Sequence, residues 1–385
     1  MKTLNPKHSV GLSLIELLIA MVLGLTLASG VLQIYASSSA TERSQDARLR
    51  MQEGGRFALN FLGNEIRMAG YLGCLGSMQG SGANNTLNAP PNTLQPGTGI
   101  QGWEAAGTNP GVVNNSANDV ATVASTTAEW TTGGVGFNIP TVQAVPNSDI
   151  LRLWGGAGDA GAVISIDNTG GDPIVAAEAA IGIAVNDFLI ISDCEQVDFV
   201  QACAVAPTGG GASTVDITLS TACNPGNLAT AFVTSVAPAG SPAEVIRLEG
   251  VLYYVGKRDD TATNPPSLYR AVLDTDGTLA APEEIIEGVE SMQLLYGVNV
   301  DQDVRATVDA YLPADLVTNW DEVISVRVSL LMQSIEDGTT SEPQAYTFDG
   351  VTYSAAGGGG SLPQDRRARR IFTSTISLRN RALGT

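Results

Sequence analysis

Histidine is almost absent from this chain of 385 residues, since His8 is its only one. Histidine is the side chain whose ordinary pKa lies nearest to neutral pH, which makes it the usual general base and a common metal ligand. Catalysis by a serine–histidine–aspartate or cysteine–histidine arrangement therefore has no support in the sequence. Nothing in the sequence places two carboxylates at a cleft, as a glycosidase would need. We expect a protein without enzymatic activity, with no metal site and no cofactor.

Basic residues are also scarce, with 20 lysines and arginines against 39 aspartates and glutamates and a net charge of −19. Such a surface repels nucleic acid, so a nucleic-acid partner is not expected. The scarcity is uneven along the chain, because the last 20 residues hold six arginines and no acid. These six are Arg366, Arg367, Arg369, Arg370, Arg379 and Arg381.

Cysteine is rare, and the four that occur are Cys74, Cys194, Cys203 and Cys223. No two of them have the C-x-x-C spacing of zinc sites and thioredoxin-like motifs. An even number of cysteines in an exported region suggests two disulfides, for which three pairings exist. We expect Cys74–Cys194 to tie an N-terminal helix to a sheet and Cys203–Cys223 to close a local loop. One pair left reduced and buried is the alternative.

The longest apolar run, Leu12–Ile34, has 23 residues and a single charge, Glu16. As a helix it spans roughly 34 Å, enough to cross the hydrocarbon core of a bilayer. Lys2, Lys7 and His8 precede it without any acid. Positive charge on the short N-terminal side predicts that this side faces the cytoplasm. Residues 12–34 are therefore expected to be a single transmembrane segment, with the rest of the chain exported.

Glu16 is unexpected in a transmembrane segment, where a central carboxylate costs about 2.5–3.5 kcal/mol on insertion scales. If the chain is cut between Gly11 and Leu12, the new ammonium group of Leu12 lies one helical turn from Glu16. The carboxylate then lies in the first turn, where the helix dipole favours it. A second copy of the helix can supply the ammonium group instead, so that Glu16 sets the register between packed helices.

A glycine followed five residues later by glutamate and by an unbroken apolar run resembles the class III signal of type IV prepilins. The resemblance implies that residues 1–11 are a leader, that prepilin peptidase cuts after Gly11 and methylates Leu12, and that Glu16 guides assembly. The phenylalanine usual in the family after the cut is replaced here by Leu12. An uncleaved signal anchor and a cleaved secretory signal are the alternatives, and the second is disfavoured by the length of the apolar run.

Apolar positions Ala58, Leu62, Ile66 and Ala69 are spaced by three and four residues and predict that the helix continues over residues 35–70 with one side packed on a sheet. Gly54–Gly55 is expected to be a soft point in this helix. Residues 71–148, rich in Asn, Gly, Thr and Ser, are expected to form a loop-rich insertion. Residues 149–385 carry repeated strand signals.

The predicted fold class is therefore α+β, with a long N-terminal helix packed on an antiparallel, β-rich exported domain. Within that domain, Gly156, Gly158 and Gly161 form a G-x-G-x-x-G pattern after the predicted strand Ile150–Trp154. A dinucleotide-binding fold needs a helix next, but the following residues, from Val163, are strand-like. A glycine-rich loop between two strands is expected instead. Glu283–Glu290 fits either a short helix or an edge strand.

Three segments resemble PilW-type minor pilins of the type IV pilus: Met51–Cys74, Trp320–Leu331 and Asp365–Arg381. The resemblance implies contacts with other minor pilins and the major pilin through the N-terminal helix, a place at the pilus tip or in its priming complex, and support of adhesion and twitching motility. It also implies location in the bacterial inner membrane before assembly and on the cell surface afterwards. Alternatives are a minor pseudopilin of a type II secretion system, or a tip adhesin that binds its ligand through residues 76–147.

The C-terminal arginines have three interpretations. Arg366, Arg367, Arg369 and Arg370 can pair with acidic groups of this chain or of a neighbouring subunit. They can contact anionic lipid headgroups before assembly. They can also lie on a solvated edge strand that resists aggregation through its charge. The alternation of side chains from Ile371 to Leu378 predicts a strand in each case.

Overall fold

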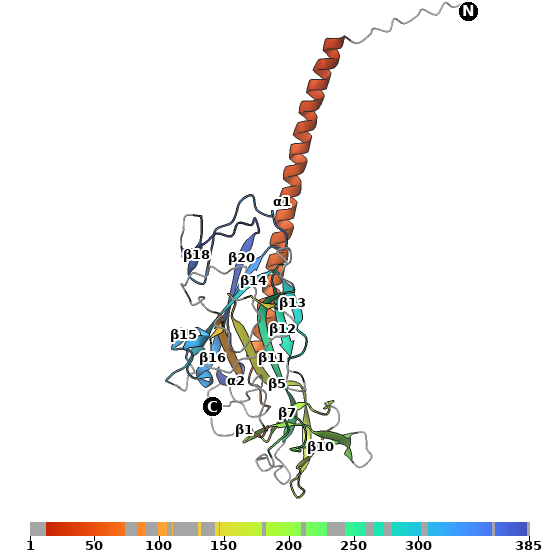
Figure 1. Cartoon of the computed structure of the whole chain (residues 1–385), viewed down its shortest axis with the longest axis vertical. Helices are drawn as coiled ribbons and strands as arrows, with labels where there is room; N and C mark the ends of the chain where they lie inside the picture. Colours follow the sequence, from red (N-terminus) through yellow and green to blue (C-terminus); the bar gives the residue numbers. More distant parts are fainter. Residues whose placement is uncertain are drawn as a thin grey trace, which may run out of the picture.

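A computed structural model of the chain shows an α+β architecture, with one long helix extending from a β-rich body (Figure 1). The predicted fold class is confirmed. The structure describes residues 13–73, 83–88, 99–105, 110, 130–131, 143–145, 147–178, 182–208, 213–228, 243–258, 265–272, 274, 279–301, 307–355 and 359–382.

Helix α1 runs from Leu14 to Met68 without interruption, preceded by the N-cap residue Ser13. It ends before Gly70, whose φ of +70° is easily adopted only by a residue without a side chain. The first residue of α1 that is buried against the body is Met51. The helix therefore has two parts, a free N-terminal part and a C-terminal part whose buried face includes Leu62 and Ile66.

The predicted soft point at Gly54–Gly55 is wrong, because α1 continues through both residues. Both glycines are buried against the sheet, where space is short. A Cβ atom at Gly55 would lie 2.5 Å from ring atoms of Phe372, and one at Gly54 would lie 3.0 Å from Cδ1 of Ile286. The glycines thus allow side chains of the sheet to approach the helix backbone, which outweighs their low intrinsic helix propensity.

Replacing Gly55 with alanine is expected to lower the free energy of unfolding by about 1–3 kcal/mol, because the added methyl group overlaps the Phe372 ring. The same change at Gly63 is the matched control, since a Cβ atom there would lie 3.7 Å from Ile376, an ordinary contact. Gly63→Ala is expected to stabilise the protein by about 0.5–1 kcal/mol through its higher helix propensity. Chemical denaturation of both variants measures the difference, and effects of the same sign and size would contradict the close contact at Gly55.

A four-stranded antiparallel sheet packs on the buried face of α1. Its strands, in spatial order, are β15 (Ala310–Leu312), β14 (Val289–Val298), β16 (Val323–Gln333) and β20 (Arg369–Ser377). Cβ atoms placed at Gly55 and Gly63 would meet Phe372 and Ile376 of β20, respectively. The distance from Gly55 to Gly63 is about 12 Å along the helix, and the distance from Phe372 to Ile376 is about 13 Å along the strand. Helix α1 and strand β20 therefore run side by side in the same direction.

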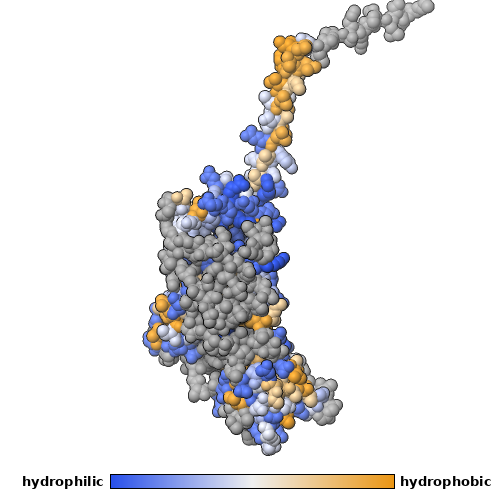
Figure 2. Space-filling view, viewed as in Figure 1, coloured by the Kyte–Doolittle hydropathy of each residue, from blue (hydrophilic) through white to orange (hydrophobic). Residues whose placement is uncertain are grey.

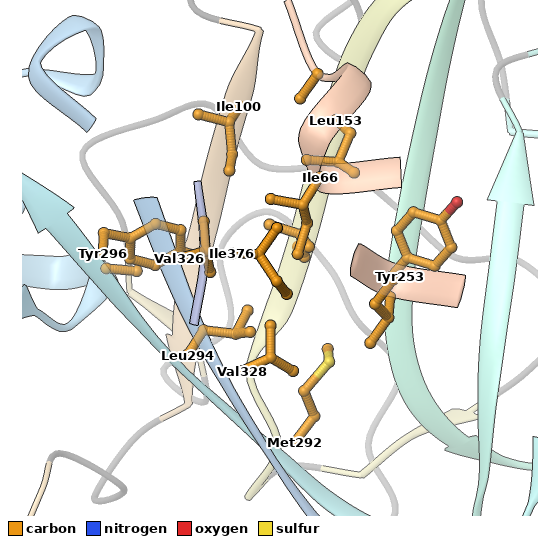
Figure 3. Close-up of a cluster of buried hydrophobic side chains, with 14 of the residues drawn as sticks. Ile66, Ile100, Leu153, Tyr253, Met292, Leu294, Tyr296, Val326, Val328 and Ile376 are labelled. Atoms are coloured by element: carbon orange, nitrogen blue, oxygen red, sulfur yellow. The ribbon is translucent and has the colours of Figure 1, made fainter. Parts of the chain in front are cut away.

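The core between α1 and the sheets is apolar and close to fully buried (Figure 3). Ala58, Leu62 and Ile66 of the helix are each 0% exposed. They meet alternate residues of the strands, which include Met292, Leu294, Tyr296, Val326, Val328, Leu330, Met332 and Ile376. Burial of a side chain such as Leu62 contributes about 1.5–3 kcal/mol, which makes this cluster the main attachment of the helix to the body.

Thirteen strands of the described chain form a second, larger sheet, in which β5 and β11 are the longest members and pair antiparallel. The strands are β1 (Ala83–Asn85), β2 (Ile100–Ala105), β3 (Trp130–Thr131), β4 (Gln143–Ala144), β5 (Ile150–Asp167), β6 (Ile174–Glu178), β7 (Phe188–Ser192), β8 (Val197–Gln201), β9 (Ala204–Pro207), β10 (Thr214–Thr218), β11 (Glu244–Lys257), β12 (Ser267–Val272) and β13 (Glu283–Glu287). The part with β7 and β10 lies at the end of the body far from the free helix (Figure 1).

Strand β5 passes through the G-x-G-x-x-G pattern without a break, so the expected glycine-rich loop is wrong. The strand pairs with β11 on both sides of a register shift, and Gly158 has a φ of +81°. A Cβ atom at Gly156 would lie 2.8 Å from Ile246, so the pattern serves close packing of strands. The undecided segment Glu283–Glu290 is strand, as β13 and the start of β14.

The remaining elements are short. A three-stranded sheet contains β17 (Tyr346–Phe348), β18 (Val351–Tyr353) and β19 (Gly359–Gly360). Two 3-10 turns, η3 (Ala314–Leu316) and η4 (Trp320–Glu322), precede β16, and helix α2 (Arg379–Ala382) follows β20.

Candidate assembly interface

The N-terminal part of α1 is free of the body, and its first half, Leu14–Ile34, is apolar around its circumference, whereas the half nearer the body is polar and charged (Figure 2). Among its side chains, Leu14 is 78% exposed, Leu27 is 74% exposed and Ile34 is 72% exposed. Within the described chain, α1 is the one helix long and apolar enough to cross a membrane. A helix with apolar residues on all sides needs a membrane or other apolar helices around it.

Glu16 lies in the first turn of α1, where the backbone N–H of Ser13 donates to its Oε2 at 3.4 Å. The same turn exposes unpaired backbone N–H groups, so the helix dipole favours the carboxylate there. Gly11 and Leu12 lie outside the described residues, and the predicted cleavage and methylation remain predictions. The role of Glu16 in assembly remains a prediction as well.

A cavity of about 270 Å³ lies where the free part of α1 meets the body. One wall is a single face of the helix and the other is formed by the end of β13, the end of β16 and the turn after it. The lining residues are Arg43, Asp46, Ala47, Arg50, Met51, Glu287, Met332, Gln333, Ser334, Ile335 and Glu336. Arg50 pairs with Asp46 at 2.9 Å, and the remaining charges are of both signs, so the cavity has no strong preference for one ionic ligand.

Arg369 is the most buried charge of the C-terminal cluster, with a side chain only 2% exposed. Its guanidinium donates to Glu290 at 2.7 and 3.1 Å and to Asp365 at 2.7 and 2.8 Å. Burial alone lowers the pKa of Arg369, but its two acidic partners outweigh burial and raise it. Arg369 thus pairs within its own chain. This agrees with the first interpretation, pairing with acidic groups of the same chain, while a contact with a neighbouring subunit remains a prediction.

The other three predicted arginines differ in their surroundings. Arg367 donates to the backbone oxygens of Ser334, at 2.7 Å, and of Ile335, so it also serves the fold of its own chain. Arg366 and Arg370 are exposed. Their contact with another subunit remains a prediction.

The predicted pair Cys203–Cys223 is a disulfide, with its Cα atoms 5.3 Å apart. It closes the segment that contains β9 and β10 at the far end of the body. Cys194 is also disulfide-bonded. Cys74 lies outside the described residues, so the pairing Cys74–Cys194 remains a prediction.

Asp149 was not singled out by the sequence, yet it joins the two large sheets. It directly precedes β5, and its carboxylate accepts hydrogen bonds from the backbone N–H of Ala105 in β2, at 3.0 Å, and of Leu294 in β14, at 2.8 Å. Burial, and secondarily the charge of Glu104, raises the pKa of Asp149 well above its ordinary value. No local pattern marks such a residue, because its partners are distant in sequence.

A metal site was not expected. Among the residues that the structure describes, no three His, Cys, Asp or Glu side chains are grouped in a way that suits a metal ion. The described features that stand out are therefore the free apolar helix and the sheet to which it is attached.

A match to a known protein family covers the part of the chain that contains the four-stranded sheet. Residues 252–380 match the family described as Type IV Pilus-assembly protein W. This range includes all four strands β14, β15, β16 and β20. It covers two of the segments on which the sequence resemblance rests, Trp320–Leu331 and nearly all of Asp365–Arg381, but not Met51–Cys74.

Among solved structures, a type IV-like pilin from Thermus thermophilus is similar at 16% sequence identity and a TM-score of 0.21, over 35% of this chain and 70% of that chain. No curated protein sequence matches this chain. The resemblance to PilW-type proteins inferred from the sequence is therefore confirmed over residues 252–380, by the family match alone.

Proposed function

We propose that this protein is a non-catalytic minor pilin that takes part in the initiation of type IV pilus assembly, at the pilus tip or in a priming complex. The observation that carries the proposal is the free apolar part of α1 on a body whose residues 252–380 match the PilW family. In the membrane, lipid surrounds this helix. In the filament, the helices of other minor pilins and of the major pilin take the place of the lipid.

The two-part construction of α1 supports this proposal. Burial begins at Met51, so the preceding part of the helix can exchange one apolar environment for another without disturbing the body. The apolar stretch available for this exchange, Leu14–Ile34, is roughly 31 Å long. The large body suits a position of low copy number better than a repeating shaft, where subunits are closely spaced. Adhesion and twitching motility would then depend on this protein through the pili that it helps to start.

A minor pseudopilin of a type II secretion system is the alternative of the same class. The match to a type IV pilus-assembly family favours the pilus. Purification of the protein with its neighbours distinguishes the two, because a pilus subunit is expected with pilins and a pseudopilin with secretion components.

The proposal is tested first by the intact mass of the protein from cells with and without prepilin peptidase. We expect a peptidase-dependent loss of residues 1–11 and the gain of one methyl group on Leu12, because the carboxylate of Glu16 lies in the first helical turn beyond the cut. The Cys203–Cys223 bond does not depend on the peptidase, so the mass difference due to disulfide formation is expected to be the same in both samples. An unprocessed mass in both strains would refute the proposal and leave an ordinary anchored protein.

A further inference from the structure

Strand β20 has one side without a neighbour in the four-stranded sheet. Its even-numbered residues direct their backbone groups toward β16, as shown by the bonds from Leu378 N to Ile324 O and from Ser334 N to Ala368 O, both 2.9 Å. Because backbone direction alternates along a strand, the odd-numbered residues direct theirs away from β16. The residues with outward backbone groups are Ile371, Thr373, Thr375 and Ser377.

In the part of the chain that the structure describes, no hydrogen bond reaches these outward groups. The open stretch is bounded at one end by Arg369, whose N–H donates to Oε1 of Gln344 at 3.2 Å. It is bounded at the other end by α2, which begins at Arg379. The length between these limits is about 23 Å, enough for a strand of ordinary size. The side chains of the four outward residues are exposed, so the edge is accessible.

The open edge also lacks the usual protection against strand addition. Natural edge strands are blocked by lysine, proline, a bulge or short length. From Ile371 to Ser377 there is no charged residue and no proline. The pairing with β16 is regular from Arg369 to Ser377, without a register shift. Isoleucine and threonine favour extended structure, so the edge is a regular template for another strand.

Charges at the two ends of the edge indicate what kind of strand fits. Arg370 and Arg379 are exposed and flank the uncharged stretch. Arg327 of the adjacent strand β16 pairs with Thr375 and lies over the Tyr311 ring. Antiparallel pairing of two copies centred on Ser374 would bring Arg370 of each copy close to Arg379 of the other. Each copy also carries a net charge of −19, so a second copy is disfavoured.

We propose that the outward edge of β20 binds an extended segment of a partner protein by strand addition, with uncharged β-branched residues in the middle of that segment and aspartate or glutamate at its ends. Main-chain hydrogen bonds to residues 371–377 supply affinity, and the flanking arginines supply the preference for acidic ends. This contact is separate from the helix packing proposed above and does not rest on it. A failure here leaves that proposal intact.

The test is hydrogen exchange on the full chain in detergent micelles, with a defined peptide as the probe. The peptide alternates threonine and valine between glutamate pairs, and the control peptide has lysine in place of glutamate. At about ten times its dissociation constant, the acidic peptide is expected to slow exchange at Thr373 and Thr375 about tenfold, since bound protein protects these amides. The lysine peptide is expected to have little effect.

Two variants make the test specific to the edge. Thr373→Pro removes an N–H that points away from β16, so it spares the existing pairing and abolishes protection by the acidic peptide. Thr375→Lys adds a charge at the edge without restricting the backbone. It replaces the proline variant if that variant does not fold, and the same loss of protection is expected. Retained protection in a folded variant, or no protection of the wild-type protein, would overturn the proposal. Equal protection by both peptides would overturn its charge preference, and protection that rises with protein concentration alone would assign the edge to a second copy.

Discussion

The change of Arg369 to alanine is expected to lower the free energy of unfolding by about 3–5 kcal/mol, the usual cost of breaking a buried ion pair by removing one partner. Arg369 donates four hydrogen bonds to Glu290 and Asp365. Without it, Glu290, whose side chain is only 12% exposed, keeps a charge that no longer has its partner. Chemical denaturation of the full chain in detergent measures the loss.

The loss is expected to shrink as the pH falls from neutral to about 4, through protonation of Glu290, and to shrink further below about 4, through protonation of Asp365. Burial raises the pKa of Glu290 even though Arg369 opposes it, so without Arg369 this pKa rises further and Glu290 becomes neutral more easily. Burial tends to raise the pKa of Asp365, but the hydrogen bonds from Arg369 outweigh it and the pKa is lowered. A lowered carboxyl pKa stabilises the fold above the unfolded pKa, and this gain disappears as the pH falls through the folded value. Both effects bring wild type and variant closer together in acid.

Arg379→Ala is the matched control, because it removes an exposed arginine from the same basic region. Surface changes of this kind usually alter stability by less than about 0.5 kcal/mol. Arg369→Lys keeps the positive charge but cannot reproduce the bonds to both carboxylates, so an intermediate loss is expected. A loss for Arg369→Ala no greater than that for Arg379→Ala would contradict the structural role of the buried pair.

Glu16→Ala is expected to affect the membrane and the filament in opposite directions. Removal of the carboxylate makes insertion of α1 more favourable by up to about 2.5–3.5 kcal/mol, depending on its depth in the bilayer. Among packed helices, the ammonium group of Leu12 then has no counter-charge, at a cost of about 3 kcal/mol or more. Each 1.4 kcal/mol is a factor of ten, so incorporation in competition with wild-type protein is expected to fall by about two orders of magnitude.

Quantification of the variant in the membrane and in sheared pili of the same cells measures both effects. Glu42→Ala is the control, since Glu42 lies on the same free part of α1 but beyond the apolar run, and it is exposed. It is expected to reach the pili at the wild-type level. Normal incorporation of Glu16→Ala would contradict the proposed pairing of Glu16 with an N-terminal ammonium group.

The features that could be predicted from the sequence depend on residues close together in the chain. The apolar run after Gly11 predicts the free helix, because its signal is a simple count of residues. Cys203 and Cys223 are separated by 20 positions and close a local loop, as expected. The alternation from Ile371 onward predicts strand β20. In each case the local pattern and the tertiary structure require the same conformation.

The features that could not be predicted depend on contacts between distant segments. Gly54–Gly55 has a low helix propensity, but its role is set by Ile286 and Phe372, which a local rule does not consider. Arg369 was expected to pair with an acidic group of this chain or of a neighbouring subunit, but the sequence could not identify Glu290, which lies 79 positions away, as its partner. Asp149 likewise owes its position to partners 44 and 145 positions away. Burial of a charge is decided by the assembled fold rather than by composition.

The parallel course of α1 and β20 has a mechanical consequence for a subunit held by its helix. A pull along α1 loads the boundary between helix and sheet in shear, because the two elements point in the same direction. All contacts from Met51 to Ile66 then share the force, whereas a pull across the sheet would peel them apart one after another. The Phe372 ring packs directly against Gly55, so sliding of the helix would bring the ring into overlap with larger neighbouring residues. The contacts between α1 and the body are therefore expected to resist a pull along the helix axis better than a pull across the sheet.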